Sequence, residues 1–102
     1  MRTEGGDMEK VANLRRLRDL DGGGPATLRD FDELGVRNVD QLAKKEPRKL
    51  YDKLCQLKGV RIDPCCLDVF TCAVAQARDP HLPKAQRQWW YWSRVRKAAT
   101  QA

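Results

Sequence analysis

Residues 19–28 read DLDGGGPATL, and this stretch decides the fold expected for the chain. Three consecutive glycines and a proline lie here between two apolar runs, so the backbone is free to reverse direction before a new helix begins. Pro25 suits the first position of that helix, because its missing N–H would have no acceptor there. The stretch therefore predicts a tight turn between two helices.

Apolar residues on both sides of this turn recur at intervals of three and four, which is the helical period. A first helix is expected to end at Gly22 and to carry the apolar residues Val11, Leu14, Leu17 and Leu20. A second is expected from Pro25 to Gly35, and a brief third over residues 39–43. Because no stretch alternates with the period of a strand, the sequence predicts an all-α chain.

Local signals mark where the later helices begin and end. Asn38 with Gln41 three residues on has the pattern of a capping box, and Pro47 opens a fourth helix that stops at Gly59. Asp63 is expected to cap a fifth helix that stops before residue 79, and a last helical stretch follows residue 83. The buried face expected for the fourth helix consists of Leu50, Leu54 and Leu57.

The first turn also resembles a known motif. Its frame, Leu17-x-x-Leu20-x-Gly22-Gly23-Gly24-x-x-x-Leu28-x-x-Phe31, is similar to the helix-hairpin-helix motif. In that motif a glycine, an apolar residue and a second glycine form the turn, and a backbone N–H at the next helix contacts a phosphate oxygen. Three features depart from it: Gly23 replaces the apolar residue, Asp19 and Asp21 precede the turn, and Ala26 stands where a lysine is common.

A second, degenerate copy follows 37 residues later, as Leu54-x-x-Leu57-x-Gly59-Val60-Arg61-x-x-x-Cys65. Here Val60 supplies the apolar residue, whereas Arg61 replaces the second glycine and Lys58 adds positive charge. With the short helix 39–43 as a bridge, the two copies predict an all-α, tandem helix-hairpin-helix domain of five to six short helices.

A wider resemblance covers residues 14–92. It is carried by five sequence blocks, which are Leu50-Tyr51, Leu54-Cys55, Asp63-Pro64-Cys65, Val69-Phe70 and Trp89-Trp90-Tyr91-Trp92. Through these blocks the chain is similar to a bacterial family labelled pathogenicity-locus or mitomycin-resistance proteins. The resemblance implies a small helix-hairpin-helix protein and gives little mechanism.

Length and charge bound the organisation and the partners. A chain of 102 residues suits one small domain, and we expect a disordered segment at 1–9, the helical domain at 10–80 and a basic aromatic extension at 81–102. The net charge of +6 favours a polyanion such as nucleic acid. Since the first ten residues are polar and no apolar run suits a membrane, a cytoplasmic location without membrane contact is expected.

The expected function is sequence-nonspecific DNA binding through backbone phosphates. The residues expected nearest the phosphates are Gly22, Gly24, Lys58, Gly59 and Arg61. Glycine lets a ligand approach the backbone closely, and a helix N-terminus favours an anion. The acidic residues beside the first turn support an alternative, a protein-protein interaction adaptor that uses the same scaffold without nucleic acid. The two alternatives differ in their response to salt.

No residue pattern indicates catalysis, a metal or a cofactor, so we expect a protein that is not an enzyme. Cys65 and Cys72 lie two helical turns apart, about 10 Å, and cannot both reach one zinc ion. Packed thiols are therefore preferred over a disulfide or a metal for Cys55, Cys65, Cys66 and Cys72. The single histidine, His81, is expected in a surface loop.

The tail QRQWWYWSRVRKAATQA combines aromatic and basic residues. Such a composition is suited to stacking on single-stranded nucleic acid. Four adjacent aromatic residues cannot all face one way, however, and a small domain has little else to bury. The preferred interpretation is that some of Trp89, Trp90, Tyr91 and Trp92 cover the core.

Overall fold

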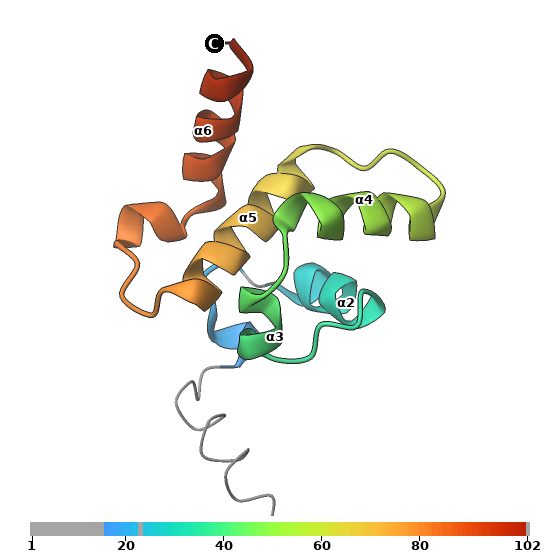
Figure 1. Ribbon diagram of the computed structural model, residues 1–102, viewed down its shortest axis with the longest axis horizontal. Coiled ribbons are helices and arrows are strands. Elements are labelled where there is room, and N and C mark those ends of the chain that lie inside the picture. Colours follow the sequence, from blue (N-terminus) through green and yellow to red (C-terminus); the bar gives the residue numbers. More distant parts are fainter. Residues whose placement is uncertain (1–15, 23, 102) are drawn as a thin grey trace, which may run out of the picture.

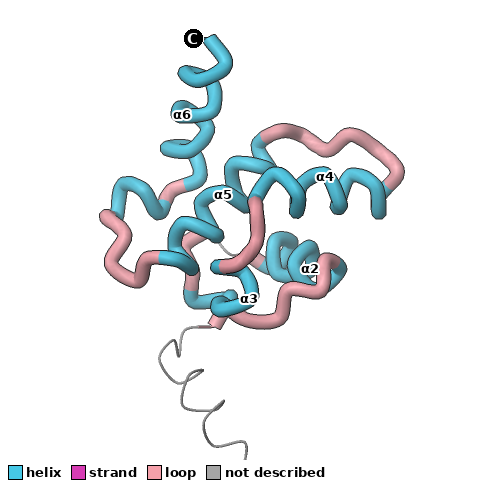
Figure 2. The backbone as a smooth tube through the Cα atoms, in the orientation of Figure 1, coloured by secondary structure: helices cyan, strands magenta, loops and turns pink. Residues whose placement is uncertain are grey.

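The computed structural model describes residues 16–22 and 24–101, and every regular element among them is a helix (Figures 1 and 2). The prediction of an all-α chain is confirmed. Two 3-10 helices, η1 (Leu17–Asp19) and η2 (Lys84–Arg87), accompany five α-helices. These are α2 (Pro25–Glu33), α3 (Val39–Ala43), α4 (Pro47–Lys58), α5 (Cys65–Arg78) and α6 (Trp89–Gln101).

Helix α5 is the central element, because α3, α4, α6 and η2 all contact it (Figure 1). Its composition explains this position. Phe70, Ala73, Val74 and Ala77 recur at helical spacing and are all buried. The rest of the core comes from η1, α2, α3, α4 and their turns, and consists of Leu20, Phe31, Leu34, Val36, Val39, Leu42, Leu50, Tyr51 and Leu54.

Helix α2 joins this core through an aromatic contact. The rings of Phe31 on α2 and Phe70 on α5 lie 5.4 Å apart, centroid to centroid. After α2 the backbone reverses at Gly35, whose φ of +79° is open to glycine and costly for most other residues. Val36 then enters the core and is almost completely buried.

The predicted helix ends are present with two changes, one at the Asn38 box and one at Asp63, which lies one residue before Pro64, the N-cap of α5. Asn38 Oδ1 accepts a hydrogen bond from the Gln41 N–H at 2.8 Å, as a capping residue does. The Gln41 side chain accepts from the N–H of Arg37 at 2.7 Å, one residue before the position that a capping box requires. The Asp63 carboxylate accepts from the Cys65 N–H at 2.8 Å, and the left-handed Gly59 ends α4.

The first predicted helix differs in its last turn. Leu17–Asp19 form a 3-10 turn, and Leu20 is already extended, with φ −76° and ψ 141°. Leu20 is buried and so holds the chain against the core before the turn begins. The expectations for Val11, Leu14, Gly23 and the segment 1–9 lie outside the described residues.

The expected apolar face of α4 is only partly correct. Leu50 and Leu54 are buried, whereas the side chain of Leu57 is 54% exposed. Leu57 lies seven residues after Leu50, nearly in line with it along the helix. Its exposure therefore follows from its place at the far end of α4, and Tyr51 fills the inner face instead.

Helix α6 is anchored to α5 by a buried ion pair. The Arg96 guanidinium donates two hydrogen bonds to the Asp68 carboxylate, at 2.8 and 3.0 Å, and Asp68 is almost inaccessible to solvent. Trp92 adds a hydrogen bond from its indole N–H to the Gln86 carbonyl at 2.7 Å.

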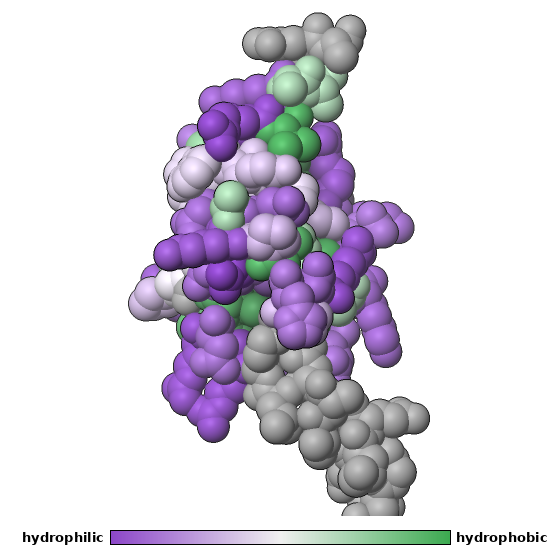
Figure 3. Space-filling model, turned by 90° about the vertical axis from the view of Figure 1, so that its left-hand side faces the viewer, coloured by the Kyte–Doolittle hydropathy of each residue, from purple (hydrophilic) through white to green (hydrophobic). Residues whose placement is uncertain are grey.

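On the side of the molecule where η2 lies, the surface is mostly hydrophilic with small apolar patches (Figure 3).

The four adjacent aromatic residues of α6 divide between packing and exposure. Tyr91 and Trp92 are partly buried and their rings meet edge to face at 5.1 Å. Trp89 and Trp90 are exposed, and the Arg94 guanidinium lies 4.8 Å from the Trp90 ring centre. None of the four enters the central core cluster, so they attach α6 rather than complete the core.

Candidate nucleic-acid interface

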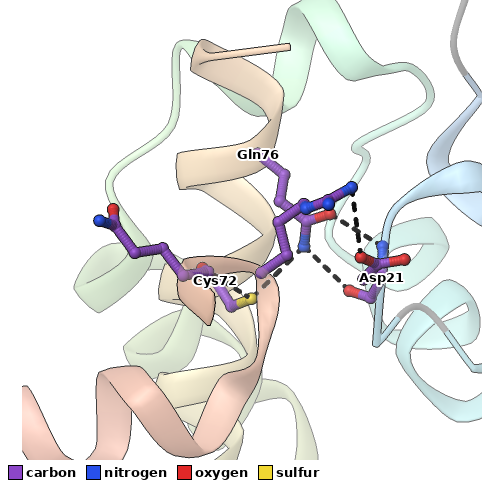
Figure 4. A network of polar contacts seen from close by, with 5 residues as sticks. Asp21, Cys72 and Gln76 are labelled. Atoms are coloured by element: carbon purple, nitrogen blue, oxygen red, sulfur yellow. Dashed lines mark hydrogen bonds and ion pairs between the residues drawn. The ribbon is translucent and has the colours of Figure 1, made fainter. Parts of the chain in front are cut away.

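The first turn is clamped to the central helix by a glutamine. The Asp21 N–H donates to Gln76 Oε1 at 2.8 Å, and Gln76 Nε2 donates to the Asp21 carbonyl at 2.9 Å (Figure 4). Gln76 lies on α5 and is 3% exposed. Because both main-chain groups of Asp21 bond the same amide, the backbone entering Gly22 is held in one position.

The acidity of this turn is partly offset in three dimensions. The Asp21 carboxylate lies 3.7 Å from the Arg87 guanidinium of η2. Both side chains are well exposed, so the pair contributes little to stability. It does place a positive charge beside the carboxylate, which reduces the repulsion that the sequence predicts for a phosphate at this turn.

Gly22 and Gly24 both lie just before the start of α2. Gly22 has φ +80°, a conformation typical of glycine, whereas Gly24 is extended, with φ −73° and ψ 174°. Gly24 is the N-cap of α2 and gives the helix no side-chain hydrogen bond. With Pro25 and Ala26 exposed beside it, the N-terminus of α2 is open to solvent.

The second predicted turn is built differently from the first. Gly59 has φ +70°, but Val60, expected to plug the turn, is 60% exposed. Ile62 packs against the core in its place, and its carbonyl accepts a hydrogen bond from the Tyr51 hydroxyl. Arg61 is exposed at the rim of a hollow of about 530 Å³ that Tyr51 also lines.

The structure does not bring the five predicted residues together. The Lys58 ammonium lies 3.0 Å from the nearer Glu33 carboxylate oxygen, at the end of α2. Gly22 and Gly24 lie at the start of α2, and a helix of nine residues separates its ends by about 12 Å. Lys58, Gly59 and Arg61 therefore form one group at the end of α4, and Gly22 and Gly24 form another.

Two features were not expected from the sequence. Four lysines that lie close together in the sequence, Lys44, Lys45, Lys49 and Lys53, line a single pocket. The sequence signal for it was the four-residue spacing of Lys49 and Lys53, since residues four apart share a helix face. The other feature is the turn at Gly35 and Val36, in which a left-handed glycine precedes a buried apolar residue.

The cysteines lie at different depths. Cys72 is buried, Cys55 and Cys66 are partly buried, and Cys65 is exposed, so the expectation of packed thiols is wrong for Cys65. Burial raises the pKa of the Cys66 thiol to about 11. A hydrogen bond with Asp63 raises the pKa of Cys65. Both thiols are therefore poor nucleophiles near neutral pH.

His81 lies in a surface turn, as expected. His81 is exposed in the turn after α5, where its N–H donates to the Asp79 carboxylate at 2.9 Å. Among the described helices, none combines the length and the apolar character that crossing a membrane requires.

These features define a small, basic, all-helical protein with exposed turns at helix ends. The chain belongs to the family described as "Cdd1: Pathogenicity locus", which matches residues 10–98. It is 32% identical over 95 residues to the mitomycin resistance protein McrB of Streptomyces lavendulae, a match covering 93% of this chain and 78% of that relative. No solved structure gives a significant match.

Proposed function

We propose that the chain is a sequence-nonspecific DNA-binding module rather than an enzyme, and that its turns act as helix-hairpin-helix turns. Backbone phosphates would meet Gly22 and Gly24 at one turn and Lys58, Gly59 and Arg61 at the other. The net charge of +6 supports binding to a polyanion. Contacts of this kind involve phosphates alone, so they carry no base sequence preference.

The observation that carries the proposal is the open N-terminus of α2. The first N–H groups of a helix have no acceptor within it, and here the N-cap is a glycine without a side chain. A phosphate oxygen would accept from these N–H groups and gain from the helix dipole. The two hydrogen bonds from Gln76 fix the backbone of Asp21, just before this turn, in the absence of a ligand.

Lys58 could contact a phosphate only if its ion pair with Glu33 opened. Its ammonium is already paired with Glu33, so a phosphate would have to compete with that carboxylate. Arg61 is exposed and takes part in no ion pair among the described residues. Arg61 is therefore expected to contribute more to DNA affinity than Lys58.

Fluorescence anisotropy with a labelled duplex at several salt concentrations tests the proposal. Log affinity should fall linearly with log salt, and Arg61→Ala should reduce that slope by about one. Ala26→Asp is a sharper variant, because an acid in the first turn favours the helix yet repels phosphate. We expect it to weaken binding about fivefold at low salt without lowering stability.

Ala26→Lys is the matched control and should strengthen binding by a similar factor. Unchanged affinity in both Ala26 variants would remove the N-terminus of α2 from the interface. No binding of the parent protein to any duplex at low salt would end the DNA proposal.

A protein-interaction adaptor is the second candidate, and one observation favours it. Leu57 and Val60 are 54% and 60% exposed beside the Gly59 turn, where a solvated surface gains nothing from apolar side chains. Leu57→Ser would weaken binding to a protein partner while leaving the salt slope for DNA unchanged. An affinity for a partner that is insensitive to salt would favour the adaptor over DNA binding.

A further inference from the structure

A pocket at the start of α4 concentrates positive charge. It lies where the turn between α3 and α4 meets the end of α2, and its volume is about 260 Å³. Buried Leu34 and Leu50 contribute to its lining. The charged residues that line it are Lys44, Lys45, Glu46, Lys49 and Lys53.

Among the described residues, no ion pair engages these four lysines. Within residues 16–22 and 24–101, the ion pairs engage other bases, such as Arg48 with Asp52 and Lys58 with Glu33. Glu46 is the single carboxylate that lines the pocket. Four exposed lysines contribute to the lining, so the surface around the pocket carries excess positive charge and favours a bound anion.

The backbone that carries the lysines is braced. Arg78 on α5 donates to the carbonyls of Ala43 and Lys45, at 2.8 and 2.9 Å. Lys44 and Lys45 also donate their N–H groups to the last turn of α3, at 3.1 and 3.0 Å. Pro47 then begins α4 with a fixed φ. The backbone on one side of the pocket is thus fixed by the fold.

The charge of the pocket indicates which anion it fits. An internal phosphodiester carries one negative charge, whereas a terminal phosphate monoester carries 1.5 to 2 at pH 7. Lysines act as point charges without the fixed fork of arginine, so they suit a group that is recognised by charge. A cavity of 260 Å³ equals about nine water volumes, which admits a phosphate and part of its sugar.

We propose that this pocket binds the terminal phosphate of a DNA strand, so that the protein prefers DNA ends to continuous duplex. The assignment rests on the proposed DNA-binding function and adds a ligand class to it. Lys49 and Lys53 lie one turn apart on the same face of α4, and Lys45 adds positive charge from the turn before that helix. Lys44 completes the site from the turn.

The test compares three labelled duplexes of one sequence: one with 5′-phosphate ends, one with 5′-hydroxyl ends, and one closed by hairpins at both ends. At low salt the phosphorylated duplex should bind about fivefold more tightly than the other two. Lys49→Ala/Lys53→Ala should bring that ratio close to one while binding to the closed duplex persists. Circular dichroism confirms that the variant is folded.

Arg94→Ala/Lys97→Ala is the matched control, since it also removes two exposed bases, but from α6. It should weaken all three duplexes alike and keep the ratio. A parent protein that binds all three equally overturns the end-binding site and leaves the DNA function standing. Binding to none of them overturns the DNA function itself.

A free 5′-mononucleotide serves as competitor. If DNA is the source of the phosphate, it should displace the phosphorylated duplex only at concentrations far above that of the duplex. Displacement at equal concentration would assign the pocket to a small phosphorylated molecule and overturn the proposal.

Discussion

At the scale of single residues, two side chains on α5 hold the first turn and α2 against the core. Gln76 replaces the hydrogen bonds that the Asp21 backbone would otherwise make with water, and it does so from a buried position. Phe70 meets Phe31 and fixes α2. The entry to the proposed phosphate site thus depends on side chains far from it in sequence.

Gln76→Ala should therefore destabilise the protein. The substitution leaves the N–H and carbonyl of Asp21 without their partners, which costs about 2 kcal/mol in the free energy of unfolding. Urea denaturation measures the change. Gln56→Ala, at an exposed position of α4, is the control and should stay within about 0.5 kcal/mol of the parent. Equal shifts in the two variants would contradict the importance of the clamp.

The thiols permit a second test at this scale. With a pKa of about 11, Cys66 is only about one part in a thousand thiolate at pH 8, whereas a free cysteine is about a quarter ionised. Alkylation at Cys66 should therefore be slow in the folded protein. It should accelerate as the pH rises toward 11 or when the chain unfolds. Mass spectrometry of the digested protein follows each site, and rapid labelling of Cys66 at pH 8 would contradict its burial.

At the scale of elements, α6 depends on a single ion pair for its main polar attachment. The Asp68 carboxylate is buried and receives two hydrogen bonds from Arg96, whose pKa is raised by that partner. Removing one member of a buried pair leaves the other charge without compensation, which is costly. Half-buried Tyr91 and Trp92 and buried Ser93 add to this attachment.

Arg96→Ala should loosen α6 more than it disturbs the rest of the fold. Hydrogen exchange should show faster exchange of the backbone amides of α6, while those of α5 remain protected. Arg94→Ala removes an exposed arginine from the same helix and should leave exchange unchanged. If both variants exchange alike, Arg96 does not anchor α6.

At the scale of the whole molecule, acidic and basic residues differ in how many of them form ion pairs. Among the described residues, several bases after Gly35 form no ion pair, such as Arg61 and Lys49, whereas Asp21 and Glu33 are each paired with a base. A protein with a net charge of +6 binds a polyanion favourably, because binding releases the cations that are condensed on the polyanion. Its stability should then respond to DNA and to salt together.

Duplex DNA should raise the melting temperature at low salt. Free DNA at a hundred times its Kd stabilises the folded state by about 2.7 kcal/mol, since it binds the native chain in preference to the unfolded one. Differential scanning fluorimetry measures the shift, which should disappear at high salt. A shift that persists at high salt would point to a contact other than phosphate.

Local features of this fold could be predicted from the sequence, whereas long-range contacts could not. Helix ends were predictable because their signals are local, as at Pro47, Gly59 and Asp63. The exposure of Leu57 was not, because nothing nearby in sequence shows where a neighbouring helix stops covering α4. The pairing of Lys58 with Glu33 joins residues 25 apart and depends on packing that no local pattern encodes.

The Gln76 clamp also has a consequence for the order of assembly. Gln76 and Asp21 are 55 residues apart in sequence, so closing that loop costs more entropy than pairing adjacent helices. Folding should then begin with α4 and α5, which are joined by a short loop, and the glycine turn should be fixed late. During unfolding the turn would be released early, and a phosphate bound there would slow its release.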